Sequence, residues 1–201
     1  MNEEQIRRAA RVVKEGGLIV YPTDTVYGLG CDPFNRASVT RLFEAKGRGS
    51  KPIPILCGSL ELAAKVVSLD STALGLARDL WPGALTIVAP GIREFPYQVD
   101  QGTGEVGVRV PAREDSIKLI IECGGYLSGT SANVSGSSSC QTAQDAFREL
   151  GAKVDIVLDG GPSASEGSTV VRVRGSDVEV LRNGLVRIPS GYRVVNSPNG
   201  S

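Results

Sequence analysis

The 201-residue chain contains no histidine. This absence excludes catalytic arrangements that pair Ser or Cys with His, and it removes the commonest general base. The four cysteines, Cys31, Cys57, Cys123 and Cys140, show no CxxC spacing, so the common zinc sites and disulfide scaffolds are not indicated. Any chemistry must therefore use carboxylates, Lys, Arg, hydroxyls, backbone amides or a soluble metal ion.

A net charge and a long apolar run are also absent. The 22 Lys and Arg residues balance the 22 Asp and Glu residues, which does not indicate a nucleic-acid binder as a whole but leaves room for a local basic cleft. No apolar run approaches the roughly 18 residues that a membrane span needs. The charged, helical start does not resemble a signal peptide. We therefore expect a cytoplasmic protein without a membrane partner.

Length and patterning predict one domain over residues 1–190 and a flexible tail over residues 191–201. Asn35 should cap a helix that runs to Lys46 and ends at Gly47, and Thr142 should begin another helix with Asp145 in a capping box. Apolar periodicity predicts further helices over 3–15 and 115–122 and from 59 and 70, a loop over 90–104, and strands over 18–21, 52–57, 84–89, 105–110, 126–130, 154–158, 168–173 and 178–182. The dipeptide at 183–184 predicts a hairpin into a strand over 185–188.

Residues 18–30 read LIVYPTDTVYGLG and combine an apolar run, a proline, two threonines around an aspartate, and two glycines. A strand should end at Tyr21, because Pro22 cannot donate a hydrogen bond to a neighbouring strand. The polar loop that follows fits an anionic-ligand site at the end of a strand. It equally fits an ordinary strand, turn and second short strand, and the stretch alone leaves both open.

Three constellations could carry chemistry. Lys46, Gly47 and Arg48 place two cations at a helix end, where the helix dipole also favours them. The run GTSAN over residues 129–133 offers hydroxyls and amides, although such clusters are usually loops. Arg109 lies on the polar face of an alternating strand, where an arginine normally meets solvent or an acidic neighbour. Neither a Walker A loop nor a dinucleotide fingerprint occurs.

The sequence contains, in this order, the motifs YPTDTVYGLG, KGR, WPGALT, VGVRVPA, GTSANVSG, EGSTVV and LRNG. Together they resemble the YrdC family of threonylcarbamoyl-AMP synthases, in its single-domain form, over about residues 12–187. The resemblance implies an α/β fold in which a twisted mixed β-sheet with flanking helices surrounds a concave basic cavity. It implies that L-threonine, bicarbonate and ATP give threonylcarbamoyl-AMP and pyrophosphate, with Mg²⁺ accompanying ATP and no tightly bound organic cofactor. A separate transferase would then place the threonylcarbamoyl group on tRNA.

The resemblance also implies roles for residues that match the motifs. The KxR residues Lys46 and Arg48 would be catalytic, would hold the triphosphate, and should lie at a solvent-facing helix end. The remaining ATP contacts would be Gly129, Ser131, Asn133, Ser139 and Arg182, with no metal ligand from the protein. Threonine would contact Thr23, Arg109 and Ser168, with Arg109 pairing its carboxylate, and Gly28 and Gly30 would shape the cavity wall.

Two departures and two alternatives accompany this resemblance. Relatives often carry an acidic or asparagine-containing spacer after KGR, where this chain has GSK, and some carry a histidine in the next strand. One alternative is an RNA-binding module of the same fold that holds tRNA or double-stranded RNA without nucleotide turnover. The other is a carbamoyl-adenylate enzyme similar to the YrdC-like part of HypF.

Overall fold

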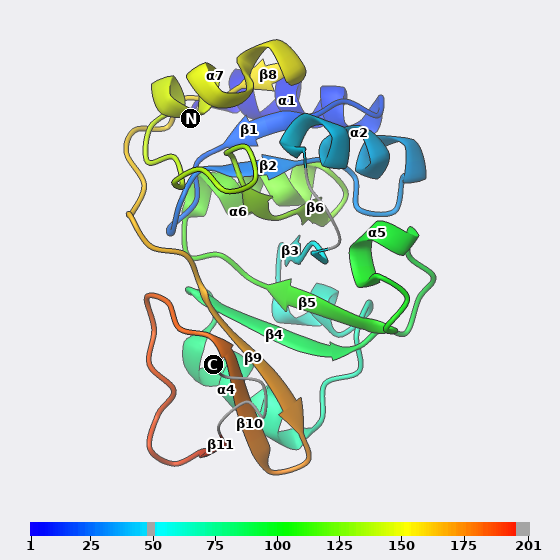
Figure 1. Ribbon diagram of the computed structural model, residues 1–201, viewed down its shortest axis with the longest axis vertical. Coiled ribbons are helices and arrows are strands. Elements are labelled where there is room, and N and C mark those ends of the chain that lie inside the picture. Colours follow the sequence, from blue (N-terminus) through cyan, green and yellow to red (C-terminus); the bar gives the residue numbers. More distant parts are fainter. Residues whose placement is uncertain (48–50, 196–201) are drawn as a thin grey trace.

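The strands of this protein form two mixed sheets that lie one above the other along the longest axis of the molecule (Figure 1). The structure is a computed structural model, and it describes residues 1–47 and 51–195. The α/β class with twisted mixed sheets and flanking helices is confirmed, with the strands divided between two sheets instead of one.

The smaller sheet has four strands in the order β7-β2-β1-β8. Its strands are β1 (Ile19–Tyr21), β2 (Gly28–Gly30), β7 (Thr130–Ser131) and β8 (Ile156–Val157). β1 pairs antiparallel with β2 and parallel with β8, and β2 pairs antiparallel with β7. Residues 18–30 are therefore two paired strands around a turn.

The larger sheet has seven strands in the order β11-β10-β9-β4-β5-β3-β6. Its strands are β3 (Ile55–Cys57), β4 (Leu85–Pro90), β5 (Glu105–Arg109), β6 (Tyr126–Ser128), β9 (Thr169–Arg174), β10 (Asp177–Arg182) and β11 (Arg193–Val195). The chain passes to the smaller sheet between β6 and β7, at Gly129, and returns between β8 and β9. Both crossings border the site described below.

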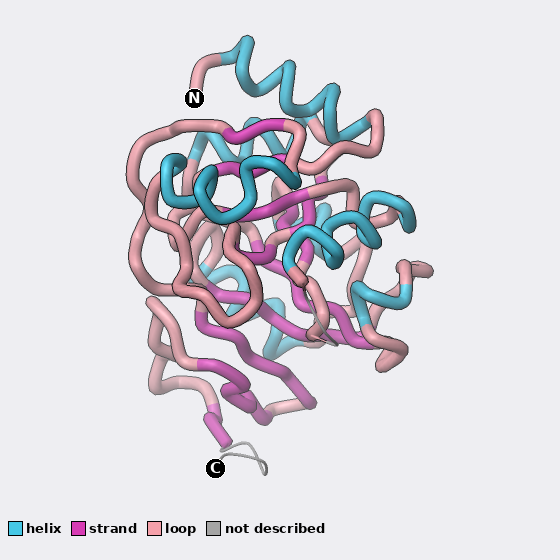
Figure 2. The backbone as a smooth tube through the Cα atoms, turned by 45° about the horizontal axis from the view of Figure 1, so that its top comes forward, coloured by secondary structure: helices cyan, strands magenta, loops and turns pink. Residues whose placement is uncertain are grey.

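Helices flank the two sheets (Figure 2). They are α1 (Glu3–Lys14), α2 (Arg36–Lys46), α3 (Leu60–Ala63), α4 (Ser71–Leu80), α5 (Tyr97–Asp100), α6 (Glu114–Glu122) and α7 (Ala143–Leu150), followed by the 3₁₀ turn η1 (Gly151–Lys153). Within residues 1–47 and 51–195, no helix has the length and apolar character of a membrane span.

Three apolar clusters hold these elements together. In one of them α1 and α6 pack on β1, through side chains such as Ile6 and Leu119 against Ile19. In another, α4 covers one face of the larger sheet, where Leu76 packs with Ile87. Because α4 occupies that face of β4 and β9, the opposite face of these strands is available to form a cavity wall.

Side-chain caps fix the helix starts that the sequence predicts. Asn35 accepts a hydrogen bond from the Ser38 amide, and Gly47 ends α2 in the left-handed conformation. Thr142 accepts from the Asp145 amide at the start of α7, while the Asp145 carboxylate accepts from the Thr142 hydroxyl. Each such N-cap contributes about 1 kcal/mol to helix stability.

The two glycines of β2 make room for Tyr21. A Cβ atom on Gly28 would lie 3.0 Å from Tyr21 Cζ, and one on Gly30 would lie 2.7 Å from Tyr21 Cε1. Neither glycine has a positive φ, and neither lines the cavity described below. The prediction that they shape the cavity wall is wrong, because the buried tyrosine ring occupies the space that side chains would need.

The prediction of a hairpin at residues 183–184 is also wrong. β9 and β10 are joined at Gly175, whose φ is +63°, and residues 185–188 form no strand. Gly184 instead lies against backbone, where a Cβ atom would be 2.4 Å from the Gly167 oxygen. β11 pairs parallel with β10 inside the segment for which a tail is predicted, and residues 196–201 lie outside the described part.

Three smaller differences concern strands and loops. The predicted loop over 90–104 contains α5. The strand predicted over 126–130 divides at Gly129 between the two sheets. A Cβ atom at this position would lie 2.6 Å from Leu56 Cγ, so the close packing here favours glycine. The strand predicted over 52–57 begins only at Ile55, directly after Pro54.

Candidate functional site

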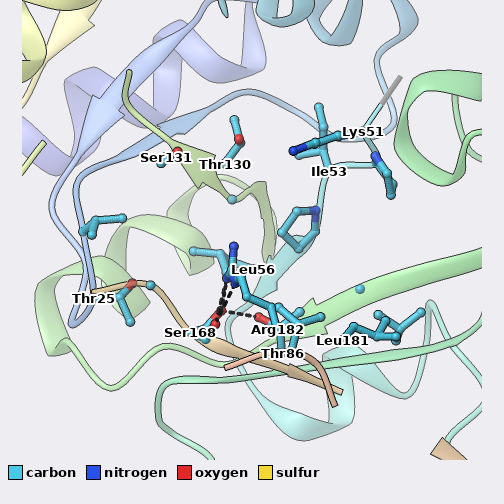
Figure 3. A pocket seen from close by; sticks show the side chains of 18 of the residues that line it. Thr25, Lys51, Ile53, Leu56, Thr86, Thr130, Ser131, Ser168, Leu181 and Arg182 are labelled. Atoms are coloured by element: carbon cyan, nitrogen blue, oxygen red, sulfur yellow. Dashed lines mark hydrogen bonds between the residues drawn. The ribbon is translucent and has the colours of Figure 1, made fainter. Parts of the chain in front are cut away.

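A cavity of about 600 Å³ lies between the two sheets (Figure 3). One wall comes from the β1–β2 turn and the crossing at residues 129–131, and the other from the face of the larger sheet that α4 leaves uncovered. Its volume falls in the range of about 300–1,000 Å³ typical of small-molecule sites. Lys51, Arg172 and Arg182 line it together with one carboxylate, Glu105, so the concave basic cavity that the resemblance implies is present.

Strand alternation determines which β5 residues form the floor of the cavity. Along β5, Val106 and Val108 are in the apolar core, so Glu105, Gly107 and Arg109 share the opposite, cavity-facing side. The register aligns Val88 of β4 with Gly107 and with Arg172 of β9. Gly107 lines the middle of this floor, and a Cβ atom there would lie 3.2 Å from a Thr86 methyl carbon, so the close packing favours glycine.

Arg109 organises one end of the site. Its side chain is buried and donates through Nε to the Gly83 oxygen at 2.8 Å, through Nη1 to Thr25 Oγ1 at 2.9 Å, and through Nη2 to Asp24 Oδ1 at 2.5 Å. Thr25 lines the cavity and also shares a 2.9 Å hydrogen bond with the Thr23 hydroxyl. Arg109 therefore ties the β1–β2 turn to the larger sheet, and of the two expected surroundings, solvent or an acidic neighbour, it has the acidic neighbour Asp24.

Arg182 and two hydroxyls form the neighbouring part of the wall. Arg182 Nη2 donates to Ser168 Oγ at 3.2 Å and, with Nε, to the Ser168 backbone oxygen. Ser168 Oγ in turn lies 2.8 Å from Thr86 Oγ1. Figure 3 shows these three side chains together, opposite Ser131 and Thr130 across the cavity.

Two arginines lie at this end of the cavity, and the Asp24 carboxylate offsets the charge of one of them, Arg109. Burial lowers the pKa of the Arg109 guanidinium, while the Asp24 carboxylate raises it. Burial also lowers the pKa of Arg182, and the charge of Arg109 lowers it further. Arginine stays protonated in spite of such shifts. Two partly desolvated cations that repel each other favour an anionic ligand between or beside them.

Lys46 lies behind the cavity wall that contains Ser131. Its side chain is 1 % exposed, and its ammonium donates to the Ser131 oxygen at 2.5 Å and to the Asn133 oxygen at 2.7 Å. The Lys46 backbone oxygen also accepts a hydrogen bond from the Ser135 amide. The predicted solvent-facing position of Lys46 is therefore wrong, because α2 ends against the 131–135 segment and its last side chain turns inward.

Asn133 is held in the same segment. Its Nδ2 donates to the Val134 and Ser137 oxygens, whereas its buried Oδ1 has no hydrogen-bond partner among the described residues. Exchanging the two amide atoms would put an oxygen against two carbonyl oxygens, so this orientation is the favourable one. A ligand hydroxyl or amine could satisfy the unpaired oxygen.

The far end of the cavity carries an ion-pair network. Arg172 Nε donates to Glu105 Oε2 at 2.9 Å, and Nη1 donates to Glu179 Oε2 at 3.3 Å. These side chains come from β9, β5 and β10. In this network two carboxylates offset the charge of Arg172, as Asp24 offsets that of Arg109 at the other end.

Comparison with known proteins identifies the family. The Sua5/YciO/YrdC family model, which carries the description "Telomere recombination", matches residues 11–184. The chain belongs to this family. This match confirms the membership of the YrdC family that the sequence motifs predict.

Named relatives of this Sua5/YciO/YrdC protein are threonylcarbamoyl-AMP synthases. One, from Vibrio cholerae, is 34 % identical over 90 % of this chain and 98 % of its own length. Another, from Pyrococcus abyssi, is 36 % identical over 97 % of this chain, which spans 58 % of that longer protein. The crystal structure of P. abyssi Sua5 complexed with L-threonine superimposes with a TM-score of 0.91 at 33 % identity, over 97 % of this chain and 60 % of the other.

The fold brings most of the predicted site residues to one place. Five of them line the cavity: Gly129, Ser131, Ser139, Ser168 and Arg182. Four others do not line it but lie within one or two contacts of its walls: Thr23, Lys46, Arg109 and Asn133. Arg48 lies outside the described residues. The individual roles of all ten stay predictions.

Sequence reasoning missed several residues that the Sua5/YciO/YrdC fold places at the cavity. Thr25 and Thr86 line it, as do Glu105 and Arg172. Strand alternation could have found Glu105 and Thr86, since each lies on the polar side of a predicted strand. The pairing of Glu105 with Arg172 depends on which strands are neighbours, and the sequence does not contain that information in a local pattern.

Proposed function

We propose that this protein is a threonylcarbamoyl-AMP synthase, which makes threonylcarbamoyl-AMP and pyrophosphate from L-threonine, bicarbonate and ATP. The proposal rests on one observation above all. A single cavity joins the serine-containing segment at 129–131, organised by Lys46, to the wall formed by Ser168, Arg182 and Thr25, which Arg109 holds. The names of the relatives support the same activity.

The reaction needs positioning and positive charge more than proton transfer. Addition of the threonine amine to bicarbonate gives a carbamate and releases water. A carbamate oxygen then attacks the α-phosphorus of ATP, and the bond from that phosphorus to the bridging oxygen breaks to release pyrophosphate. Because the carbamate is already an anionic nucleophile, a histidine base is not required.

The two walls suit the two parts of this reaction. On one side, the backbone and hydroxyl groups of residues 129–131 and Ser139 would contact the nucleotide, with Asn133 Oδ1 free to accept from a ribose hydroxyl. On the other side, the charge of Arg109 and Arg182 would attract the carboxylate of threonine and the developing charge on phosphate. Lys46 would act mainly by holding the nucleotide wall in place.

Mg²⁺ would enter with ATP and neutralise phosphate charge. Within residues 1–47 and 51–195 no group of three or more His, Cys, Asp and Glu side chains could hold a metal ion. Mg²⁺ commonly binds through substrate phosphates and one or two carboxylates, which fits an ion carried by the nucleotide. The carboxylates nearest the site, Asp24 and Glu105, already accept hydrogen bonds from arginines.

The proposal extends to the biological setting. Threonylcarbamoyl-AMP would pass to a separate transferase that modifies tRNA, in the cytoplasm where these substrates occur. The alternative of an RNA-binding module without turnover is less well supported, since the 22 Lys and Arg residues are balanced by 22 Asp and Glu residues and the named relatives are synthases. The HypF-like alternative is less well supported because the relatives at 32–39 % identity are named as threonylcarbamoyl-AMP synthases.

Pyrophosphate release by the purified protein tests this function. With ATP, Mg²⁺, L-threonine and bicarbonate all present, we expect steady release. Omission of either L-threonine or bicarbonate should reduce it to the background rate, because the nucleophile forms only from both. Release that continues unchanged without threonine would reject the proposed function, and salt-sensitive RNA binding with no release would favour the RNA-binding alternative.

A further inference from the structure

Thr86 lies at the cavity floor in a position that links two strands. It is in β4, its side chain is 2 % exposed, and it lines the cavity together with Ser168, which is 6 % exposed. The Thr86 and Ser168 hydroxyl oxygens are 2.8 Å apart. Figure 3 shows their hydrogen bond beside the bonds from Arg182 to Ser168. Nothing in the motif resemblance gives Thr86 a role.

The donors and acceptors of this group can be counted. Arginine has no acceptor, so Arg182 Nη2 must donate to Ser168 Oγ. The two hydroxyls carry two protons, and one of these lies in the hydrogen bond between them. Among the described residues neither hydroxyl has a further hydrogen-bond acceptor. One O–H donor is therefore left over, whichever hydroxyl donates to the other.

The leftover donor has a definite ligand chemistry. Both hydroxyls border the cavity, so the remaining proton can reach an acceptor only there. The register aligns Thr86 with Val170, which is paired in turn with Arg182, and places Ile87 opposite Val108, so Arg109 follows on the neighbouring strand. A donor beside the buried Arg109 and the more exposed Arg182 suits an anionic oxygen, such as one from a carboxylate.

We propose that Thr86 is a positioning residue for the amino-acid substrate. It holds the Ser168 hydroxyl so that the pair offers one O–H donor to a carboxylate oxygen of L-threonine. This inference rests on the proposed function, and it adds a residue on β4 to the recognition of the substrate. A purely structural threonine would not make substrate affinity depend on its hydroxyl group.

The experiment compares Thr86→Val with Thr86→Ser in the full chain. Valine keeps the shape of threonine and removes the hydroxyl, whereas serine keeps the hydroxyl and removes a methyl group. We expect Thr86→Val to raise the KM for L-threonine roughly ten- to hundred-fold, as for loss of one hydrogen bond to a charged group, and to change the KM for ATP less than about two-fold. Thr86→Ser should restore the KM for threonine to within about three-fold of the wild-type value.

Three controls accompany this comparison. Thr40→Val makes the same change on α2, away from the cavity, and should leave both KM values unchanged. Calorimetric titration with L-threonine alone measures binding without turnover, and thermal unfolding checks that each variant is folded. If the wild-type protein releases pyrophosphate without threonine, the proposed function fails and this inference fails with it.

Other results would overturn this inference while the proposed function still holds. If wild-type turnover requires threonine but Thr86→Val leaves the affinity for threonine unchanged, the hydroxyl pair does not contact the substrate. If Thr86→Ser is impaired as strongly as Thr86→Val, the methyl group and not the hydroxyl is responsible. A Thr86→Val variant that fails to fold, beside a folded Thr86→Ser variant with weakened threonine binding, also overturns the inference.

Discussion

Replacing Lys46 with alanine should reduce pyrophosphate release at least about a hundred-fold and should also destabilise the fold. The Lys46 ammonium donates to two backbone oxygens, those of Ser131 and Asn133. Because Lys46 is buried, water does not reach these hydrogen bonds. The Ser131 oxygen would keep the Asn133 amide as a donor, whereas the Asn133 oxygen would lose the ammonium, which costs about 1–3 kcal/mol in the free energy of unfolding. Without these hydrogen bonds, the cavity wall formed by residues 129–131, which we propose contacts the nucleotide, should lose its position.

Urea denaturation and steady-state kinetics together measure this effect. Lys46→Met keeps the apolar stem and removes the charge, so it separates packing from hydrogen bonding and should remain nearly as impaired as the alanine variant. Lys65→Ala removes an exposed lysine and should leave both stability and turnover unchanged. A Lys46→Ala protein with wild-type stability would show that the ammonium does not support the 131–135 segment.

Replacing Arg109 with alanine should have an effect of similar size on turnover, for a different reason. The guanidinium joins Gly83, Thr25 and Asp24, so its loss frees the β1–β2 turn and removes positive charge from the threonine end. It also leaves the Asp24 carboxylate without its partner in a mostly buried place. We expect at least about a hundred-fold loss in kcat/KM for threonine and about 3–5 kcal/mol of lost stability.

A double variant separates the two consequences. In the Arg109→Ala background, Asp24→Asn removes the stranded negative charge, so stability should partly return while threonine-dependent turnover should not. Arg109→Lys keeps the charge, but its donors all lie on one nitrogen and cannot reach the three separate acceptors that the planar guanidinium spans, so it should retain only part of the activity. Arg174→Ala, at an exposed arginine of the same sheet, is the control. Recovery of turnover in the double variant would contradict a substrate role for Arg109.

Local patterns predicted the helices well, and the reason is physical. The start of α2 is fixed by Asn35 and its end by Gly47, both within one helical turn of the groups they serve. Such contacts depend on neighbours in the sequence, so they can be read from it. The strand that ends at Tyr21 is set in the same way, by the proline that follows.

Contacts between distant segments could not be predicted. Lys46 is a cation at a helix end, which normally faces water, and only the proximity of residues 131–135 buries it. Arg109 follows the alternation of its strand correctly, but the partner that covers it, Asp24, is 85 positions away. The family resemblance pointed to both residues without showing that one supports a wall and the other ties a turn to a sheet.

The prediction of a hairpin at residues 183–184 failed for a related reason. Gly184 is needed because the chain passes close to the backbone of residues 167–168, next to Ser168. An asparagine–glycine pair looks the same in sequence whether the glycine serves a turn or a close approach of two backbones. The consequence here is functional, since this approach places Arg182 beside Ser168.

The most direct test of the account follows the carbon of bicarbonate. The purified protein is incubated with ATP, Mg²⁺, L-threonine and ¹³C-labelled bicarbonate, and the nucleotide products are analysed by mass spectrometry. We predict a threonine-containing adenylate that carries one ¹³C atom in its carbamoyl group and forms in step with pyrophosphate. AMP or ADP as the only nucleotide product, or an adenylate without the label, would contradict the proposal that this cavity joins threonine, bicarbonate and ATP.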